Sequence, residues 1–200
     1  MLPSNYTNIH GWCTVEKANK LMEIVKSCRP LLSVELGVFG GKSLLPIALM
    51  SKELNINSKI IGVDSWSVQA CIEGTNDKAN ADWWSNIDYE EIFNYTKFLM
   101  IEHKVDDVVE LWRNTSKNVV SKFEDNSIDL LHQDSNHSEE ITCEEVELYW
   151  NKVKEGGYWI FDDTNWPTTQ KAQGLLLSKG YTEIYSHNRE WKIYLRNKPE

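Results

Sequence analysis

The chain has 200 residues, 41% of them hydrophobic and 26% charged, which suits one soluble globular domain. Its net charge of −9, without a lysine- and arginine-rich cluster, argues against nucleic acid or an anionic membrane as its main partner. No apolar stretch has the length of a transmembrane helix, and the N-terminus lacks the features of a signal peptide. The four cysteines form no C-x-x-C pair, so we expect reduced thiols and a cytoplasmic protein.

Apolar spacing predicts helices that alternate with strands along the chain. The N-terminal segment, residues 1–30, is expected to be helical from Val15 to Ser27, with Thr14 as its N-cap. The expected strands are 31–36, 59–63, 108–112, 127–133, 158–161, 181–185 and 191–196. The other expected helices are 43–54, 88–103, 116–123, 138–153 (stopped by Gly156-Gly157) and 167–178. This alternation predicts a single α/β domain with a parallel sheet between two layers of helices.

The stretch VELGVFGGKSLL places three glycines between an expected strand and an expected helix. It is no P-loop, because the first glycine of that motif would fall on Leu36. It is no dinucleotide fingerprint either, because Phe39 stands where the backbone must approach a pyrophosphate. The pattern that remains is E-x-G-x-x-x-G, made by Glu35, Gly37 and Gly41. It suits a compact cofactor without phosphates, and the simpler alternative is a strand-to-helix turn with no ligand.

Two acidic side chains support the cofactor interpretation. The Glu35 carboxylate can pair with the ammonium group of an amino acid. Asp64 ends the next expected strand, where doubly wound folds bind the ribose of adenosine.

Acidic residues also follow directly after two later expected strands. The stretch IDLLHQDSNHS carries Asp134, and GGYWIFDDTNW carries Asp162 and Asp163. The carboxyl ends of parallel strands converge on one crevice, where three carboxylates repel one another unless a cation joins them. Oxygen ligands favour a hard ion such as Mg²⁺. His137 follows closely, placed to act as general base on a substrate at that ion. Taken singly, each residue can also be a helix cap, a solvated loop residue or a surface histidine.

Together these stretches resemble the class I S-adenosylmethionine-dependent methyltransferases. More narrowly, the chain resembles the metal-dependent O-methyltransferases of the type 24 branch, which includes sugar O-methyltransferases of macrolide biosynthesis. The matching stretches, within residues 31–196, are VELGVFGGKSLL, IIGVDSWS, SIDLLHQDSNHS, VKEGGYWIFDDTNW and YTEIYSHNREWKIYLRN. The resemblance implies a Rossmann-like, doubly wound seven-stranded sheet of order 3-2-1-4-5-7-6, with the last strand antiparallel.

The resemblance also implies the roles of individual residues. The implied S-adenosylmethionine-binding residues are Glu35, Gly37, Gly41, Ser43, Asp64, Ser65, Trp66, Ser116 and Asp134. The implied Mg²⁺ ligands are Asp134, Asp162 and Asp163, with His137 as the catalytic base. The chain departs from the family pattern at three positions, Ser65, Gln133 and Ser135, and none of these removes a functional group.

The acceptor is expected to be a sugar hydroxyl, such as that of the 6-deoxyhexose rhamnose. Residues 65–100 are expected to form a lid over it. The side chains expected to hold the sugar are Trp66, Trp83, Trp84 and Trp166 by stacking, and Asp82 and Asp88 through hydroxyl groups. The alternatives are a catechol or phenolic acceptor and, from another class, a nucleotide-binding or non-catalytic Mg²⁺ protein. A homo-oligomer, or a module of a larger glycan-building protein, is compatible with the sequence.

Overall fold

The computed structural model describes residues 1–75 and 77–198. Seven strands form one sheet in the order β3-β2-β1-β4-β5-β7-β6, which confirms the predicted order. Neighbouring strands from β3 to β5 pair in parallel, and β7 runs antiparallel to β5 and β6. The strands are β1 Leu32–Leu36, β2 Lys59–Asp64, β3 Val109–Arg113, β4 Ile128–Gln133, β5 Val153–Phe161, β6 Tyr181–His187 and β7 Trp191–Arg196.

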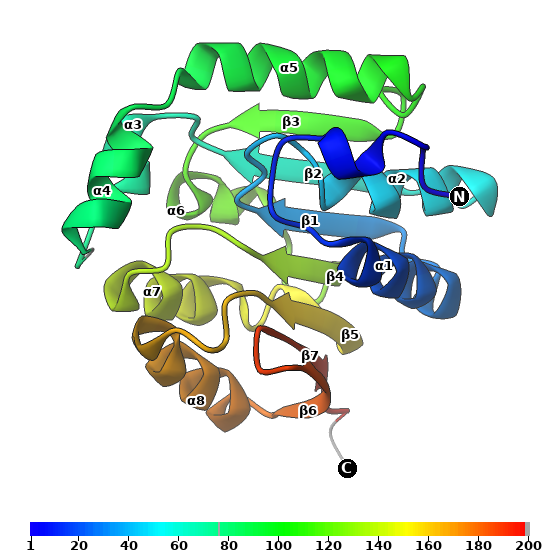
Figure 1. The fold of residues 1–200 in the computed structure, drawn as a ribbon. Coiled ribbons are helices and arrows are strands. Elements are labelled where there is room, and N and C mark those ends of the chain that lie inside the picture. Colours follow the sequence, from blue (N-terminus) through cyan, green and yellow to red (C-terminus); the bar gives the residue numbers. More distant parts are fainter. Residues whose placement is uncertain (76, 199–200) are drawn as a thin grey trace.

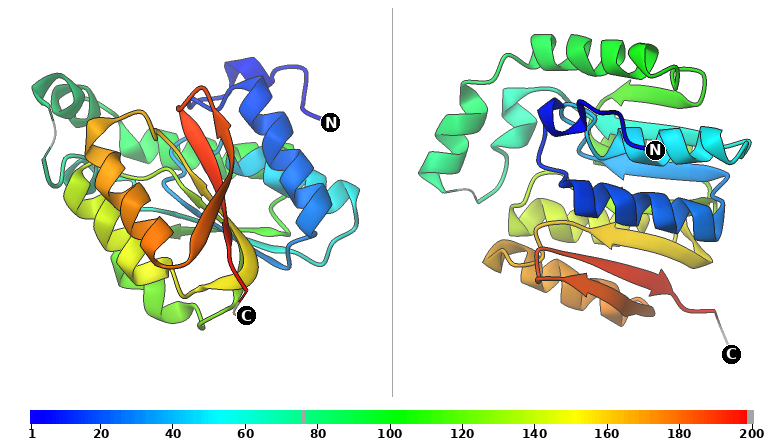
Figure 2. Two further views of the ribbon diagram at one scale, coloured as in Figure 1. Left: turned by 90° about the horizontal axis from the view of Figure 1, so that it is seen from below. Right: turned by 45° about the vertical axis from the view of Figure 1, so that its right-hand side comes forward.

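Helices cover both faces of the sheet, as Figures 1 and 2 show. On one face lie α1 (Val15–Cys28), α2 (Leu44–Glu53) and α5 (Tyr89–Glu102); on the other lie α6 (Ser116–Val119), α7 (Glu139–Tyr149) and α8 (Gln170–Ser178). Three single-turn 3-10 helices span Tyr6–Asn8, Val120–Lys122 and Pro167–Thr169. The short helices α3 (Val68–Cys71) and α4 (Lys78–Ser85) project beyond the carboxyl edge of the parallel strands.

Successive residues of a strand pack into two separate hydrophobic cores, one on each face of the sheet. Ile60 and Leu130 pack with α1, α2 and α5, whereas the next residues, Ile61 and Leu131, pack with α7 and α8. This is the two-residue period of a sheet buried on both faces. In the described part of the chain no helix is long and apolar enough to cross a bilayer. All four cysteines are free.

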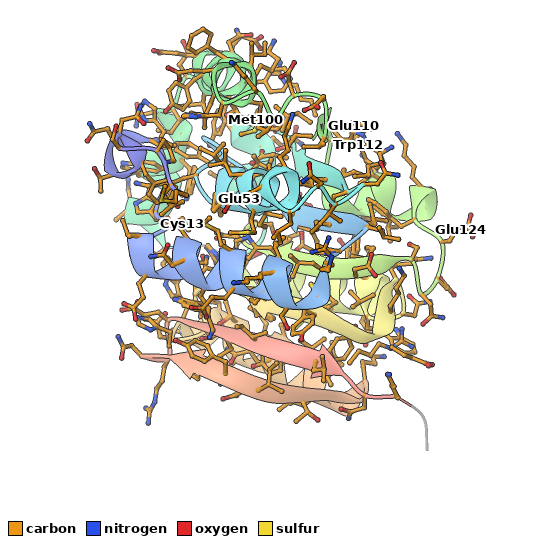
Figure 3. The ribbon with its side chains drawn as sticks, turned by 90° about the vertical axis from the view of Figure 1, so that its right-hand side faces the viewer. Cys13, Glu53, Met100, Glu110, Trp112 and Glu124 are labelled. Carbon is orange, nitrogen blue, oxygen red and sulfur yellow. The ribbon has the colours of Figure 1, made fainter. Side chains whose placement is uncertain are left out.

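Helix α1 forms the second half of the N-terminal segment, and it packs beside α2. Figure 3 shows this pair, with Cys13 at the start of α1. The predicted N-cap is confirmed, because the Thr14 side chain accepts a hydrogen bond from the Lys17 N–H. Tyr6 Oη donates to the Lys42 carbonyl at 2.9 Å, which ties the N-terminal segment to the glycine loop.

The prediction was wrong about the end of α7. The helix stops at Tyr149 rather than Val153, and Val153 already belongs to β5. The pair Gly156-Gly157 lies inside this strand, beside the register shift between β4 and β5. Gly156 has φ +75°, and a side chain at Gly157 would meet the Lys154 carbonyl. These glycines therefore allow a bulge in the strand rather than stopping a helix.

The carboxyl ends of β1 and β4 touch at Gly37. The Asp134 N–H donates to the Leu36 carbonyl at 2.8 Å, and Gly37 has φ +86°. A Cβ at Gly37 would overlap the carbonyl group of Asp134. Glycine is therefore required both by its left-handed backbone and by the close approach of the neighbouring strand.

We expect Gly37→Ala to destabilise the fold more than the matched variant Gly180→Ala. Gly180 has the same φ of +86° but open space around the added Cβ. Gly180→Ala should lower the unfolding free energy by about 1–2 kcal/mol, because only the left-handed backbone conformation disfavours alanine there. The Gly37 variant should cost at least about twice as much, because it also clashes with backbone. Urea denaturation of both variants measures the difference, and equal losses would contradict this account.

Candidate active site

A cavity of about 650 Å³ opens at the carboxyl edge of the parallel strands. It lies between the glycine loop, the ends of β2, β4 and β5, the helix α4 and the N-terminal segment around Trp12. Its size is within the range of small-molecule and cofactor sites.

Most of the predicted site residues line this cavity. They are Gly37, Ser43, Asp64, Ser65, Ser116, Asp134, His137, Asp162 and Asp163. Three predicted cofactor-binding residues do not line it: Glu35, Gly41 and Trp66. Part of the predicted lid lines the cavity, namely Ser65, Ala70, Cys71, Glu73, Asn80, Trp83, Trp84 and Tyr89. The rest of α5 packs on the sheet through Leu99 and Met100.

Glu35 lies fully buried beneath the glycine loop. Its Oε1 accepts a hydrogen bond of 2.6 Å from Ser43 Oγ, and its Oε2 is 3.3 Å from His132 Nδ1. His132 is also fully buried, with its Nε2 3.8 Å from Asp134 Oδ2. The carboxylate of Glu35 thus connects the loop to the end of β4 instead of facing the cavity.

Gly41 and Trp66 lie between the glycine loop and α5. A side chain at Gly41 would meet Met100 and Thr96 of α5. The indole N–H of Trp66 donates to the Phe39 carbonyl at 3.0 Å, and its buried ring packs on Phe93. These two residues therefore shape the loop without reaching the cavity.

Asp64 holds the glycine loop through backbone N–H groups. Its Oδ2 accepts from Val38 and Phe39, each at 2.9 Å, and its Oδ1 accepts from Trp66 at 2.7 Å. Burial raises the pKa of Asp64, and these three hydrogen bonds act in the opposite direction. The predicted ribose-binding carboxylate is thus also the residue that fixes the loop conformation.

Asp134, Asp162 and Asp163 form an acidic cluster at the ends of β4 and β5, and this cluster contains a cation that the sequence did not predict. Lys17 of α1 is 3% exposed, its Nζ forms an ion pair with Asp162 Oδ2, and it lies 3.6 Å from Asp134 Oδ2. Burial and the neighbouring Asp162 raise the pKa of Asp134 well above its usual value. Burial acts to raise the pKa of Asp162 too, but Lys17, Asp134 and His132 together outweigh burial and hold that pKa below the ordinary value. The sequence signal that could have found Lys17 is its position four residues before Leu21, which places it on the buried face of α1.

His137 stands on the cavity side of the same cluster. Its Nε2 is 3.0 Å from Asp163 Oδ2 and 3.9 Å from Asp134 Oδ1, and its ring packs on Trp166. Asp163 has φ +47°, a strained conformation for this residue type, and its carbonyl accepts from Trp166 N–H and Thr169 Oγ. Burial raises the pKa of Asp163, and His137 acts in the opposite direction.

The three predicted Mg²⁺ ligands do not gather around one point. Side-chain ligand atoms lie within 4.8 Å of one another in two groups, His132 with Asp134 and Asp162, and Asp134 with His137 and Asp163. The inner group already holds the Lys17 ammonium. The outer group offers an imidazole as its third ligand, whereas Mg²⁺ prefers oxygen. The residues present therefore do not fit a divalent ion held jointly by Asp134, Asp162 and Asp163.

Glu145 of α7 is a second buried group that the sequence analysis did not single out. It lines the cavity at 1% exposure and accepts from Ser135 Oγ at 2.6 Å and Gln133 Nε2 at 2.9 Å. Burial raises its pKa. Gln133 also accepts from the buried Trp159 N–H, which explains a polar side chain at this position.

Aromatic rings form one wall of the cavity. Trp12 lies 5.2 Å from Phe39, 5.3 Å from Trp83 and 5.8 Å from Trp84, measured between ring centres. Both Trp12, which is 66% exposed, and Trp83, which is 45% exposed, line the cavity. The predicted hydroxyl-binding residues Asp82 and Asp88 do not line the cavity; Asp82 pairs with Lys78, and Asp88 caps α5.

The fold is that of a class I methyltransferase. The model of the type 24 family, described as a methyltransferase domain, matches residues 34–164, from β1 to the loop after β5. This is more than half of the chain, which therefore belongs to this methyltransferase family. No curated protein matches the chain significantly by sequence.

Solved structures share the fold at low identity. TomG, an O-methyltransferase of tomaymycin synthesis from Streptomyces achromogenes solved with SAM, has a TM-score of 0.71 and 10% identity over 99% of this chain and 92% of its own. The O-methyltransferase NovP has a TM-score of 0.70 and 17% identity over 92% of this chain and 79% of its own. A methyltransferase from Geobacter sulfurreducens has a TM-score of 0.64 and 12% identity over 92% and 80%.

We expect Asp64→Asn to loosen the glycine loop. The amide has one acceptor atom and directs an N–H toward backbone N–H groups, so the variant should lose about 1–3 kcal/mol of unfolding free energy. The matched control is Asp88→Asn, because Asp88 accepts two backbone N–H groups with its side chain but is exposed. It should change stability by less than about 0.5 kcal/mol, because Asn caps helices as well as Asp. Denaturation curves that rank the two variants in reverse would refute the role given to Asp64.

Proposed function

We propose that the chain transfers the methyl group of S-adenosylmethionine to a hydroxyl oxygen. The observation that carries this proposal is His137, which faces a cavity of cofactor size in a chain of the methyltransferase family. The fold shared with TomG and NovP, which are O-methyltransferases, supports the same reaction.

In the proposed reaction, His137 acts as general base. Its Nδ1, the ring nitrogen not paired with Asp163, takes the proton of the acceptor hydroxyl while the oxygen forms a bond to the methyl carbon. The carbon–sulfur bond breaks, and its electron pair stays on sulfur, which leaves neutral S-adenosylhomocysteine and the methyl ether. Asp163, 3.0 Å from Nε2, would orient the imidazole and stabilise its protonated form.

The cofactor would lie along the glycine loop. In this arrangement Gly37 and Ser43 lie at its methionine end, Asp64 and Ser65 at the ribose, and Asn114 to Ser116 near the adenine. All of these residues line the cavity. Loop backbone held by Asp64 would bind the cofactor in a preformed site.

We propose a sugar as the acceptor, with a 6-deoxyhexose such as rhamnose as the first candidate. The exposed, cavity-lining rings of Trp12 and Trp83 support this choice, because aromatic rings stack on the apolar face of a sugar. A catechol or phenol would also stack there, and it is the second candidate.

Other sequence predictions stay predictions. They are the Mg²⁺ cofactor, the cytoplasmic location, and assembly as a homo-oligomer or within a larger glycan-building protein. The ion pair between Lys17 and Asp162 weighs against the Mg²⁺ prediction.

The direct test supplies methyl-labelled S-adenosylmethionine with a panel of free sugars, glycosides, catechols and simple phenols. Label recovered in a sugar ether would support the proposal in full. Label in a phenolic ether would keep the reaction and change the acceptor. Cofactor binding without label transfer to any hydroxyl of the panel would argue against this acceptor chemistry.

We expect His137→Ala to reduce turnover by about 10²–10⁴-fold, the usual contribution of a general base. Affinity for S-adenosylhomocysteine, measured by calorimetry, should stay nearly unchanged. The control is His103→Ala, because His103 follows α5 and does not line the cavity. A matching loss of cofactor affinity in the His137 variant would show that the residue supports the fold or the cofactor instead.

We expect Trp83→Ala to raise KM for the acceptor by about two- to tenfold, as the loss of one aromatic contact predicts. The KM for S-adenosylmethionine should not change. Trp112→Ala is the control, since Trp112 lies on β3 and outside the cavity wall. Initial-rate kinetics with the acceptor found above measure both constants. An unchanged acceptor KM would remove Trp83 from the acceptor site.

A further inference from the structure

Lys17 carries an ammonium group into the interior of the site. The side chain comes from the first turn of α1 and is 3% exposed. Its Nζ contacts Asp162 Oδ2 and lies 3.6 Å from Asp134 Oδ2, at the ends of β5 and β4. It lines the same cavity as His137.

Fold stability alone does not account for this lysine. Burying an ammonium and two carboxylates costs desolvation free energy that their attraction only partly returns, and apolar side chains of similar volume often do as well. The rest of the buried stripe of α1 is apolar, with Ala18, Leu21 and Val25. A charged group at this one position therefore points to a role in the adjoining cavity.

The position is the one that a bridging metal ion would take. His132, Asp134 and Asp162 offer ligand atoms within 4.8 Å of one another, and the ammonium contacts two of these three residues. A divalent ion there would sit beside the ammonium, and like charges at such a separation repel strongly in a buried site. The ammonium and the ion therefore exclude each other.

We propose that Lys17 is the built-in cation of this active site: its ammonium group replaces a divalent ion between Asp134 and Asp162, and methyl transfer needs no divalent ion. The transfer part rests on the proposed function, whereas the occupancy of the cation position does not. Lys17 neutralises charge beside the cavity, where the acceptor oxygen becomes negative as its proton leaves. It is a positioning residue, because it acts through the two carboxylates.

The first experiment measures Mn²⁺ binding, since Mn²⁺ takes the same oxygen ligands as Mg²⁺ and its free form has an electron paramagnetic resonance signal. The full-length chain is titrated as wild type, as Lys17→Ala and Lys17→Met, and as the control Lys26→Ala. Lys26 is an exposed lysine on the same helix. Lys17→Met keeps most of the side-chain volume if the smaller residue prevents folding.

Wild type and Lys26→Ala should leave the free Mn²⁺ signal undiminished. A Lys17 variant that folds should bind Mn²⁺, because removal of the ammonium exposes the carboxylate pair to the ion. That binding should disappear when Asp162→Asn is added. Stoichiometric binding by wild type would overturn the proposal. Folded Lys17 variants that bind no Mn²⁺ would overturn it as well.

The second experiment compares methyl transfer in EDTA and in Mg²⁺. Equal rates are expected for wild type. A fall of about a hundredfold or more in EDTA, as expected when a metal ion supplies Lewis-acid catalysis, would overturn the proposal. Absence of transfer in either condition would count against the proposed function, and the Mn²⁺ titration would still decide the occupancy of the cation position.

Discussion

The ion pair between Lys17 and Asp162 is the interaction on which the site depends. It joins α1 to the end of β5, and the nearby Asp134 adds the end of β4. Three parts of the chain that are distant in sequence therefore meet at one charge cluster. Without the ammonium, two buried carboxylates would face each other, and the cluster would need another cation or extra protons. The N-terminal segment thus lines the candidate site as well as covering the sheet.

A second constraint is the fixed backbone of the glycine loop, which lines the cavity. Gly37 lies against the Asp134 carbonyl, and Asp64 holds the loop above it through backbone N–H groups. Asp134, through its backbone carbonyl, and Asp64, through its carboxylate, therefore fix the backbone that lines the cavity.

The sequence predicted the fold well because its strands are strongly apolar and its helices are periodic. Errors arose where one residue type serves two purposes, as at Gly156-Gly157, which form a bulge in β5 rather than a helix stop. In the site, carboxylates at strand ends were predictable from topology. The inward direction of Lys17, the burial of Glu35 and the partners of Glu145 were not, because each depends on contacts between distant segments.

The most direct measurement is a calorimetric titration of the purified chain with S-adenosylhomocysteine, once in Mg²⁺ and once in EDTA. A methyltransferase whose cation is Lys17 should bind the product with the same affinity in both conditions, since the cofactor cavity is complete without a divalent ion. Absence of binding in both would contradict the methyltransferase account. Binding that requires Mg²⁺ would contradict the role given to Lys17.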